Sequence, residues 1–262
     1  GDSQQFQFLT RDSGLTWYGW EPYKFDGPLG ELWAWGKNLL GPLGQNDIVE
    51  RSSPTQIPGT TWTASGTTAG FGQVAFGRKN DGTLWTWGDN EKGNLGLNDE
   101  NERSSPTQVP GTTWSNMVSM GNEFPVGSAA VKTDGTLWTW GSNYRGVLGH
   151  SSAPAQVSAL SSPTQLPGTT WSTDPDTLGK GDNRMSAIKT DGTLWYWGYG
   201  GYGAMGNNQP SPSYFSSPVQ LPGTTWKNIS VGRYVTVATK TDNTLWSWGY
   251  GGYGSLGQNQ GG

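Results

Sequence analysis

The chain contains no cysteine and a single histidine among its 262 residues. The first absence excludes a disulfide framework and thiolate metal sites, and the second leaves His150 without a partner for a histidine-based metal centre. Only 14% of the residues are charged and the net charge is −4, which gives no electrostatic support for nucleic acid or anionic membranes. We therefore expect no metal, no nucleic-acid partner and no membrane insertion.

Long apolar stretches are also missing. No run approaches the roughly 18 residues of a membrane-spanning helix, and the first segment lacks the basic and apolar regions of a signal peptide. Hydrophobic residues make up only 32% of the chain, which is low for a globular protein. The chain is, however, rich in tryptophan, with 16 residues, and in glycine, with 42. Since a buried tryptophan hides roughly 150–250 Å² of surface, few such side chains can form a core. This composition predicts a globular protein.

The tryptophans belong to an internal repeat. Its core, Asp-Gly-Thr-Leu-Trp-x-Trp-Gly, occurs at 81–88, 134–141, 191–198 and 242–249, where Asn243 replaces the first glycine, and more loosely at 30–36. The closing glycines at 36, 88, 141, 198 and 249 recur at intervals of 51 to 57 residues. A period of this length is typical of propellers and other repeat arrays.

Each repeat has recognisable parts. Thr83–Trp87 alternates with a period of two, which indicates a strand, and the preceding Asp81-Gly82 predicts a hairpin of type I′. A second motif, Ser-Ser-Pro-Thr-Gln-Val-Pro-Gly-Thr-Thr-Trp at 104–114, recurs at 52–62, 161–171 and 216–226. Its prolines favour an edge strand. Because no segment shows a sustained 3.6-residue period, we expect essentially no helix.

These parts predict an all-β, five-bladed propeller that forms one domain over residues 1–262. The repeats lie near 30–80, 81–133, 134–190, 191–241 and 242–262 plus 1–20. Ser13–Trp17 matches the Pro-Gly-Thr-Thr-Trp element that the last repeat lacks, so we expect residues 1–20 to complete the last blade and close the ring. The predicted core consists of the paired tryptophans Trp33, Trp35, Trp85, Trp87, Trp138, Trp140, Trp195, Trp197, Trp246 and Trp248.

Leu137–Gly149, with the pattern Leu-Trp-x-Trp-Gly-x-Asn-x-x-Gly-x-Leu-Gly, resembles the repeat of the regulator of chromosome condensation (RCC1) family. The resemblance covers roughly residues 30–257 and implies a β-propeller, most often of seven blades; five repeats imply a smaller ring or a piece of a longer chain, and we favour the smaller ring. Gly121–Phe124 and Gly232–Val235 replace the family's Gly-x-x-His. No long insertion or basic tail supports nucleotide-exchange or chromatin roles. The repeats are also similar to those in phage structural proteins.

Loops on the fixed scaffold provide the candidate binding residues. Two Gly-x-Gly-x-x-Gly loops carry Tyr199, Tyr202, Tyr250 and Tyr253, but no helix follows as a dinucleotide site requires, so we expect no cofactor. These tyrosines either contact carbohydrate or protein, or pack between blades, and we favour packing. The variable loops 150–160 and 207–215 complete the set of candidates, which is Tyr144, His150, Tyr199, Tyr202, Tyr214, Phe215, Tyr250 and Tyr253.

Catalysis is not indicated. The repeated aspartates Asp81, Asp134, Asp191 and Asp242 occupy the same turn of different repeats, which is typical of turn chemistry. Asn98–Glu102 is rich in oxygen ligands but lacks the spacing of a calcium-binding EF-hand. We found no nucleophile–base pair.

We therefore predict a non-catalytic binding or structural module of a virion or cell surface. Its loops would contact protein subunits or a host-surface receptor, with a glycan as a further candidate ligand, and an oligomer is compatible with this role. The alternatives are a soluble carbohydrate-binding lectin, with equivalent sites in several blades, and a proteinaceous enzyme inhibitor, with one tight partner.

Overall fold

The computed structural model describes residues 30–63, 74–119, 127–150, 159–181, 183–209 and 213–257, together with the backbone of short strands at 7–11, 17–18 and 68–69. These residues form five antiparallel sheets. The helices among them are single 3₁₀ turns: η1 (Tyr144–Gly146), η2 (Pro175–Thr177), η3 (Gly201–Gly203) and η4 (Gly252–Gly254). The all-β prediction is thus confirmed. No helix in the described ranges is long and apolar enough to cross a membrane.

The sheets follow the repeats in sequence. The first has the order β2-β1-β3-β4 and the next three are meanders with the orders β5-β6-β7-β8, β9-β10-β11-β12 and β13-β14-β15-β16, whereas the fifth, β17-β18-β19, has three strands among the described residues. Their bounds are β1 (Gln7–Arg11), β2 (Trp17–Tyr18), β3 (Gly30–Gly36), β4 (Arg51–Trp62), β5 (Thr68–Ala69), β6 (Val74–Arg78), β7 (Leu84–Gly88), β8 (Arg103–Gln108), β9 (Trp114–Ser119), β10 (Gly127–Lys132), β11 (Leu137–Ser142), β12 (Ala159–Gln165), β13 (Leu178–Gly181), β14 (Arg184–Ile188), β15 (Leu194–Tyr199), β16 (Tyr214–Leu221), β17 (Trp226–Val231), β18 (Val235–Lys240) and β19 (Leu245–Gly249).

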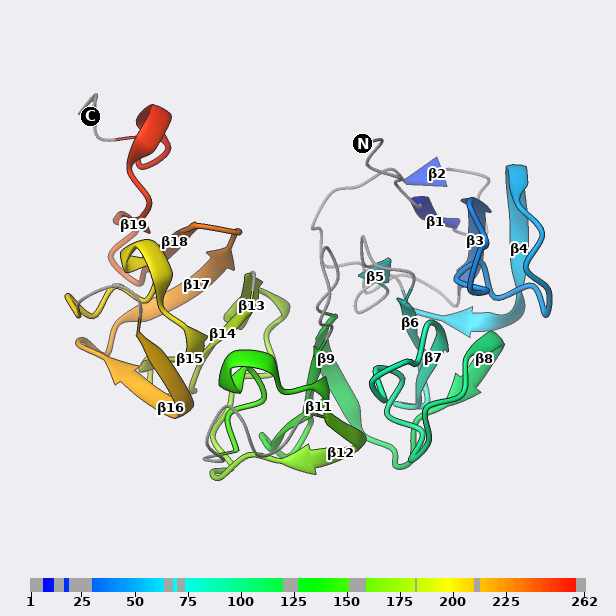
Figure 1. The fold of residues 1–262 in the computed structure, drawn as a ribbon, viewed down its shortest axis with the longest axis horizontal. Coiled ribbons are helices and arrows are strands. Elements are labelled where there is room, and N and C mark those ends of the chain that lie inside the picture. Colours follow the sequence, from blue (N-terminus) through cyan, green and yellow to red (C-terminus); the bar gives the residue numbers. More distant parts are fainter. Residues whose placement is uncertain are drawn as a thin grey trace.

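The five sheets succeed one another along an arc, and the first and last do not pair with each other (Figure 1). The N-terminal strands belong to the first sheet, because β1 pairs with β3 along its whole length and β2 pairs with β1. The prediction that residues 1–20 complete the last blade is therefore wrong for the strands at 7–11 and 17–18. The physical reason is that β4 occupies one edge of β3, and the N-terminal segment supplies the partner for the other edge. Residues 1–6, 12–16 and 19–20 lie outside the described part.

The hairpin turns also differ from the type I′ prediction. Gly82 has a φ of +77°, whereas Asp81 is not among the residues with positive φ. The amide of Gly82 donates to Lys79 O at 3.0 Å, and Asp81 Oδ1 accepts from the amide of Thr83 at 2.9 Å and from its hydroxyl at 2.6 Å. Such a three-residue loop ends in one left-handed glycine. The aspartate therefore serves as an acceptor that fixes the turn, as its repetition predicted.

Three tryptophans meet on each of the last four sheets. Trp114, the last residue of one Pro-Gly-Thr-Thr-Trp element and the first residue of β9, lies edge-on to Trp138 and Trp140 of β11 in the same sheet, with ring centroids 6.3 and 6.1 Å apart. The same trio recurs as Trp62 with Trp85 and Trp87, Trp171 with Trp195 and Trp197, and Trp226 with Trp246 and Trp248. This geometry is favourable for aromatic pairs.

A hydrogen bond from the second tryptophan of each Leu-Trp-x-Trp strand attaches its sheet to the preceding one. We call the three tryptophans together with this bond a junction. The indole of Trp197 donates to Val147 O, in the loop of the preceding sheet, at 2.7 Å. The equivalent bonds run from Trp87 to Pro42 O, from Trp140 to Asn94 O and from Trp248 to Ala204 O. Each sheet is therefore attached to the previous one by a buried donor with a fixed direction.

Among the tryptophans predicted to form the core, burial is greatest at the second position of each pair, where Trp87, Trp140 and Trp197 are completely buried. The first position is half-buried, as at Trp85, Trp138 and Trp195, and a lysine lies over it; Lys132 Nζ is 4.4 Å from the Trp138 ring. Trp33, Trp35 and Trp248 are also half-buried. Trp246 was expected in the core but is 47% exposed, because no strand in the described part covers β19.

We expect Trp197→Phe to lower the free energy of unfolding by about 2–4 kcal/mol, because it leaves buried Val147 O without its donor and opens a small cavity. Trp195→Phe is the matched control. Its indole bonds Thr193 Oγ1 at 2.9 Å within the same half-exposed turn, so we expect a loss of about 1 kcal/mol or less. Urea denaturation of both variants measures the difference, and equal losses would contradict the proposed role of the junction.

Hydrogen bonds from the Thr136 hydroxyl and amide hold the pKa of Asp134 below its usual value of 3.8. The stabilisation is therefore complete above pH 3.8 and is lost as the pH falls through the folded-state pKa. We expect Asp134→Asn to lower the thermal midpoint at neutral pH, because the amide oxygen is a weaker acceptor, and the difference from the parent chain to vanish in acid. Thermal denaturation across the pH range tests this, and a pH-independent difference would count against it.

Candidate functional site

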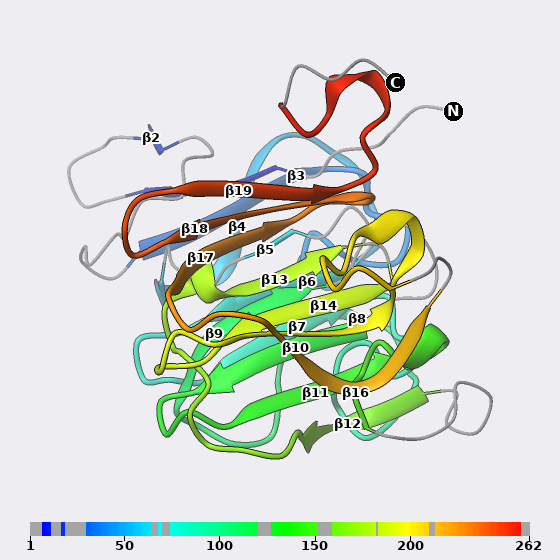
Figure 2. The same ribbon diagram turned by 90° about the vertical axis from the view of Figure 1, so that its left-hand side faces the viewer.

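The loops with variable sequence gather at one end of the sheets. Antiparallel pairing places the end of β11 beside the start of β10, with Gly141 opposite Gly127, and likewise sets Gly249 opposite Val235. The loops after β3, β7, β11, β15 and β19 therefore begin at the same end as that at which β6, β10, β14 and β18 start (Figure 2). We call this the loop end. The Asp-Gly turns and Pro-Gly-Thr-Thr-Trp elements occupy the opposite end.

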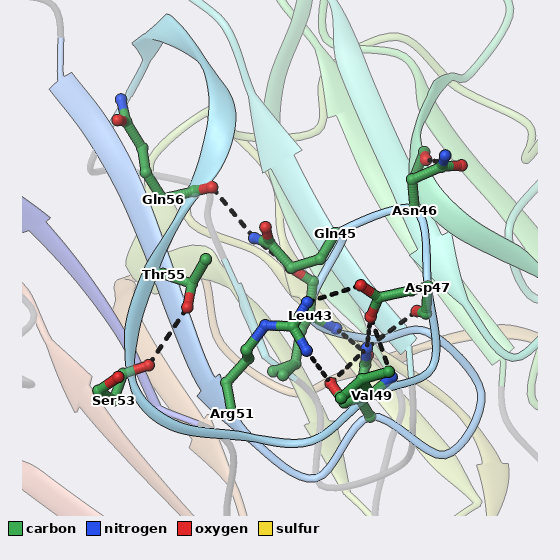
Figure 3. Close-up of polar contacts among 11 residues, drawn as sticks. Leu43, Gln45, Asn46, Asp47, Val49, Arg51, Ser53, Thr55 and Gln56 are labelled. Atoms are coloured by element: carbon green, nitrogen blue, oxygen red, sulfur yellow. Dashed lines mark hydrogen bonds and ion pairs between the residues drawn. The ribbon is translucent and has the colours of Figure 1, made fainter.

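In the first repeat the loop is closed by its own polar groups (Figure 3). Asn38 donates to Asp47 O at 2.9 Å and Val49 O at 3.1 Å and accepts from the Leu43 amide at 3.0 Å, while Arg51 contacts Asp47 at 2.6 Å. The hydrogen bond from the Val49 amide, followed by that from Arg51, lowers the pKa of Asp47.

Asn90, Asp99 and Arg103 repeat this arrangement in the second repeat. The oxygen-rich segment Asn98–Glu102 is therefore part of a self-satisfied loop. Within the described ranges, no group of three acidic, histidine or cysteine residues could hold a metal.

The loops of the last three repeats carry strained backbone at one position. Arg145 in η1, Tyr202 in η3 and Tyr253 in η4 have φ values of +60°, +60° and +58°. A left-handed conformation costs a bulky residue roughly 1–2 kcal/mol, and glycine would adopt it freely. Strained residues of this kind cluster at functional sites. Large side chains are thus retained at three positions where the backbone alone favours glycine.

The tyrosines form two clusters. Tyr202 from the fourth sheet's loop packs against Tyr234 and Tyr250 of the fifth sheet, with ring centroids 5.0 and 5.6 Å apart. In the second cluster Tyr199 and Tyr214 are 5.4 Å apart, and the guanidinium of Arg145 lies 4.2 Å from the Tyr199 ring. We define the tyrosine surface as these residues with the two exposed tyrosines of neighbouring loops: Tyr144, Arg145, Tyr199, Tyr202, Tyr214, Tyr234, Tyr250 and Tyr253.

The structure distinguishes between the predicted binding residues. Tyr144, Tyr202, Tyr214, Tyr250 and Tyr253 are exposed, and Tyr253 is fully so at 101%. Tyr199 is half-buried. The tyrosines therefore do both things that the sequence left open: they pack between neighbouring sheets and they present ring faces to solvent.

Two predicted residues point elsewhere. Phe215 packs against Tyr196 at 5.4 Å and borders a buried hydrophobic cluster. His150 is half-buried with Nε2 2.8 Å from Thr139 Oγ1. Because that hydroxyl already donates to Leu148 O, the imidazole is the donor. Burial lowers the pKa of His150, which favours the neutral ring.

Sequence reasoning missed Tyr234, Arg145 and a group of exposed aliphatic side chains. Tyr234 lies in the stretch 232–235, where the family's histidine is replaced, and this departure was the available signal. Leu39, Ile48 and Val49 are exposed on the first sheet's loop. At the corresponding positions, the loop of the second repeat has the polar residues Glu91, Glu100 and Asn101.

The tyrosine surface offers aromatic faces, hydroxyl groups and the cation of Arg145, and the guanidinium of Arg233 lies beside it, 5.1 Å from the Tyr234 ring. Rings of this kind provide contact area at a low cost in conformational entropy.

The chain was compared with known proteins. The family model described as the regulator of chromosome condensation (RCC1) repeat matches residues 81–126, 134–172 and 191–239. The mouse E3 ubiquitin-protein ligase HERC2 is 26% identical over 87% of this chain and 5% of its own length. The mitochondrial RCC1 domain-containing protein RUG3 of Arabidopsis thaliana is 27% identical over 87% of this chain and 52% of its own length. The chain thus spans from a twentieth to about half of these relatives.

Solved structures show the same fold. Yeast Prp20, solved in complex with Kap60, superposes with a TM-score of 0.68 at 19% identity, over 87% of this chain and 54% of that one. Human WBSCR16 gives a TM-score of 0.68 at 20% identity, over 88% of this chain and 61% of that one. At these identities the similarity concerns the fold alone.

We expect Tyr253→Asn to leave the thermal midpoint unchanged or to raise it, by up to about 1 kcal/mol of stability, because asparagine tolerates the left-handed backbone and the fully exposed ring contributes no packing. Tyr250→Asn should lower the midpoint, because this ring packs against Tyr202 and Tyr234. Differential scanning calorimetry of both variants is the measurement. Destabilisation by Tyr253→Asn would show that the side chain is structural.

Proposed function

Because the chain belongs to the RCC1 repeat family, we propose that it is a non-catalytic, protein-binding module whose contact area is the tyrosine surface at the loop end. The observation that carries the proposal is the retention of Arg145, Tyr202 and Tyr253 at left-handed positions of three successive loops. Glycine at these positions would relieve the backbone strain and stabilise the fold. The larger side chains are therefore consistent with selection for contacts with a partner.

The asymmetry of the surface favours a protein over a carbohydrate. A lectin built from repeats would place equivalent pockets in several sheets, whereas the tyrosines are confined to the last three. The corresponding loops of the first two repeats carry Leu39-Leu40 and Glu91-Lys92. Two clusters of aromatic residues with flanking arginines, on neighbouring loops, have the composition of protein-interface cores. Prp20, whose structure contains bound Kap60, supports such a role for this fold by analogy.

A virion or cell-surface setting remains a prediction that rests on the near-identical repeats. A host-surface receptor and a neighbouring subunit both fit the tyrosine surface. The alternative of an enzyme inhibitor predicts the same surface with one tight partner, and the lectin alternative predicts glycan binding at several sites per chain.

We expect a variant with Tyr202, Tyr250 and Tyr253 changed to serine to lose protein binding by at least tenfold, since aromatic anchors dominate interface energies. The immobilised chain is presented with a displayed peptide library and, separately, with a glycan array. Enriched peptides are then titrated against parent and variant by calorimetry. Peptide binding that depends on the tyrosines supports the proposal.

The matched control is Glu91→Ser with Lys92→Ser, which changes the same loop of the second repeat and should leave affinity unchanged. Circular dichroism and thermal midpoints establish that both variants are folded. Saturable glycan binding at several sites, without peptide binding, would replace the proposal with the lectin alternative. Equal loss in the control variant would refute the assignment of the site.

A further inference from the structure

The third repeat carries a cation of a kind that the second repeat neutralises within its own loop. The two loops match residue for residue after the Trp-Gly that precedes them, so Lys92 and Arg145 occupy the same place. Lys92 Nζ lies 3.2 Å from Glu91 Oε1. The third repeat has Tyr144 where the second has Glu91, and Arg145 forms no ion pair with a carboxylate in the described part of the chain.

Carboxylates are missing from all three loops that carry the tyrosine surface. The sequence of the last three repeats has no aspartate or glutamate in 142–158, 199–213 or 250–262. The loop of the second repeat, by contrast, is acidic, with Asp89, Glu91, Asp99, Glu100 and Glu102. The third repeat has therefore kept the cation of this loop and lost every anion that the matching loop contains.

Aromatic rings hold the Arg145 guanidinium instead. Its Cζ lies 4.2 Å from the centroid of the Tyr199 ring and 5.0 Å from that of Tyr144. A guanidinium placed over a ring contacts it through its flat face and keeps its N–H donors in its own plane. Two of these donors match the two oxygens of a carboxylate, and such a bidentate pair is among the strong charge-assisted contacts.

The backbone on both sides of Arg145 is anchored to the fourth sheet. A Cβ on Gly146 would lie only 2.9 Å from Ser216 Cα, so the loop touches β16 at this glycine. Val147 O accepts the indole proton of Trp197 at 2.7 Å. The guanidinium is therefore presented from a fixed loop, which lowers the entropy that a ligand must overcome on binding.

We propose that Arg145, with Tyr144, Tyr199 and Tyr214, is a carboxylate-binding site, and that its ligand is an acidic peptide segment of a partner protein. The inference rests on the proposed function and adds the chemistry of the partner. An aspartate or glutamate of the segment accepts from the Arg145 fork. An apolar residue beside it packs on Tyr199 and Tyr214, whose ring centroids are 5.4 Å apart. Tyr144 and Tyr214 are 47% and 48% exposed and accessible to such a segment.

The charges of the second repeat set the direction of the bound segment. Glu100 and Glu102 are exposed on its loop, and the second sheet precedes the third along the arc (Figure 1). Because like charges repel across an interface, an acidic segment extends from Arg145 away from the second repeat. It then crosses the loop of the fourth repeat, where Tyr199 and Tyr202 lie.

The test uses two displayed peptide libraries that are identical except that one encodes no aspartate or glutamate. Both are selected on the full chain, and the enriched peptides are titrated by calorimetry. We expect binders only from the library with acidic residues. Their affinity should fall by about tenfold between about 0.05 and 0.5 M NaCl, because salt screens the charge pair.

The libraries also separate this proposal from the proposed function. Binders that come equally from the acid-free library, and that are lost in the triple tyrosine variant, would overturn the carboxylate site and leave the tyrosine surface as a protein-binding area. Absence of binders from both libraries would refute the protein-binding role together with the carboxylate site.

Variants of one position locate the charge. Arg145→Gln should weaken the acidic peptides by about tenfold or more, because it removes a charge-assisted hydrogen bond. Arg145→Lys keeps the charge but loses the fork, so its affinity should lie between the two. Lys92→Gln is the matched control, since Lys92 occupies the same place and already pairs with Glu91. Equal losses in Arg145→Gln and Lys92→Gln, in variants that circular dichroism shows to be folded, would refute the site.

A second pair of variants copies the second repeat into the third. Tyr144→Glu supplies the neighbouring carboxylate that Lys92 has, so it should compete for Arg145 and repel the acidic peptide. Tyr144→Gln removes the same ring without adding charge. We expect the glutamate variant to bind about fivefold more weakly than the glutamine variant, because only it places a like charge against the ligand. Equal affinities would contradict the proposal.

The chain's own acidic residues are tested in the same way. Glu123 and Asp182 lie in the segments that lead into β10 and β14, outside the described residues. Glu123→Gln and Asp182→Asn should leave the affinity for acidic peptides unchanged. A gain of about tenfold in either variant, the size expected for release of a charge pair, would show that the chain itself occupies Arg145 and would overturn the proposal.

Discussion

The structure depends on one junction, in which the tryptophan of each Pro-Gly-Thr-Thr-Trp element lies against the two tryptophans of a Leu-Trp-x-Trp strand, and the second of these two donates its indole proton to the loop of the preceding sheet. Trp171, Trp197 and Val147 O form one example. The stacked rings supply apolar burial, and the buried hydrogen bond supplies direction. Because each junction spans two repeats, the loops and sheets hold each other in place along the arc.

The same junction explains why glycine and serine recur at the loop end. The loop that accepts the indole proton also approaches the next sheet's fourth strand so closely that only glycine over serine fits, as with Gly41 and Ser104. Packing between sheets therefore fixes most of each loop. The residues left free to vary are those that project outward, and in the last three repeats they are tyrosine and arginine.

Much of the fold could be predicted from the sequence. The repeat and the strand period predicted the all-β sheets correctly, and the tryptophan spacing indicated the positions at which Trp87, Trp140 and Trp197 lie buried. The sequence pattern did not predict which sheet the N-terminal strands join. Ser13–Trp17 resembles the missing element of the last repeat, yet β1 and β2 pair in the first sheet, since strand pairing is decided by which edges are open and not by resemblance.

The sequence by itself determined the repeat, the strands and the candidate loops, because these depend on side-chain period and turn chemistry within a few residues. Only the tertiary structure decided which tyrosines stay exposed, that Phe215 and His150 turn inward, and that Tyr234 joins the surface from a different hairpin. The physical reason is that exposure and proximity arise from contacts between repeats roughly fifty residues apart, which no local pattern encodes.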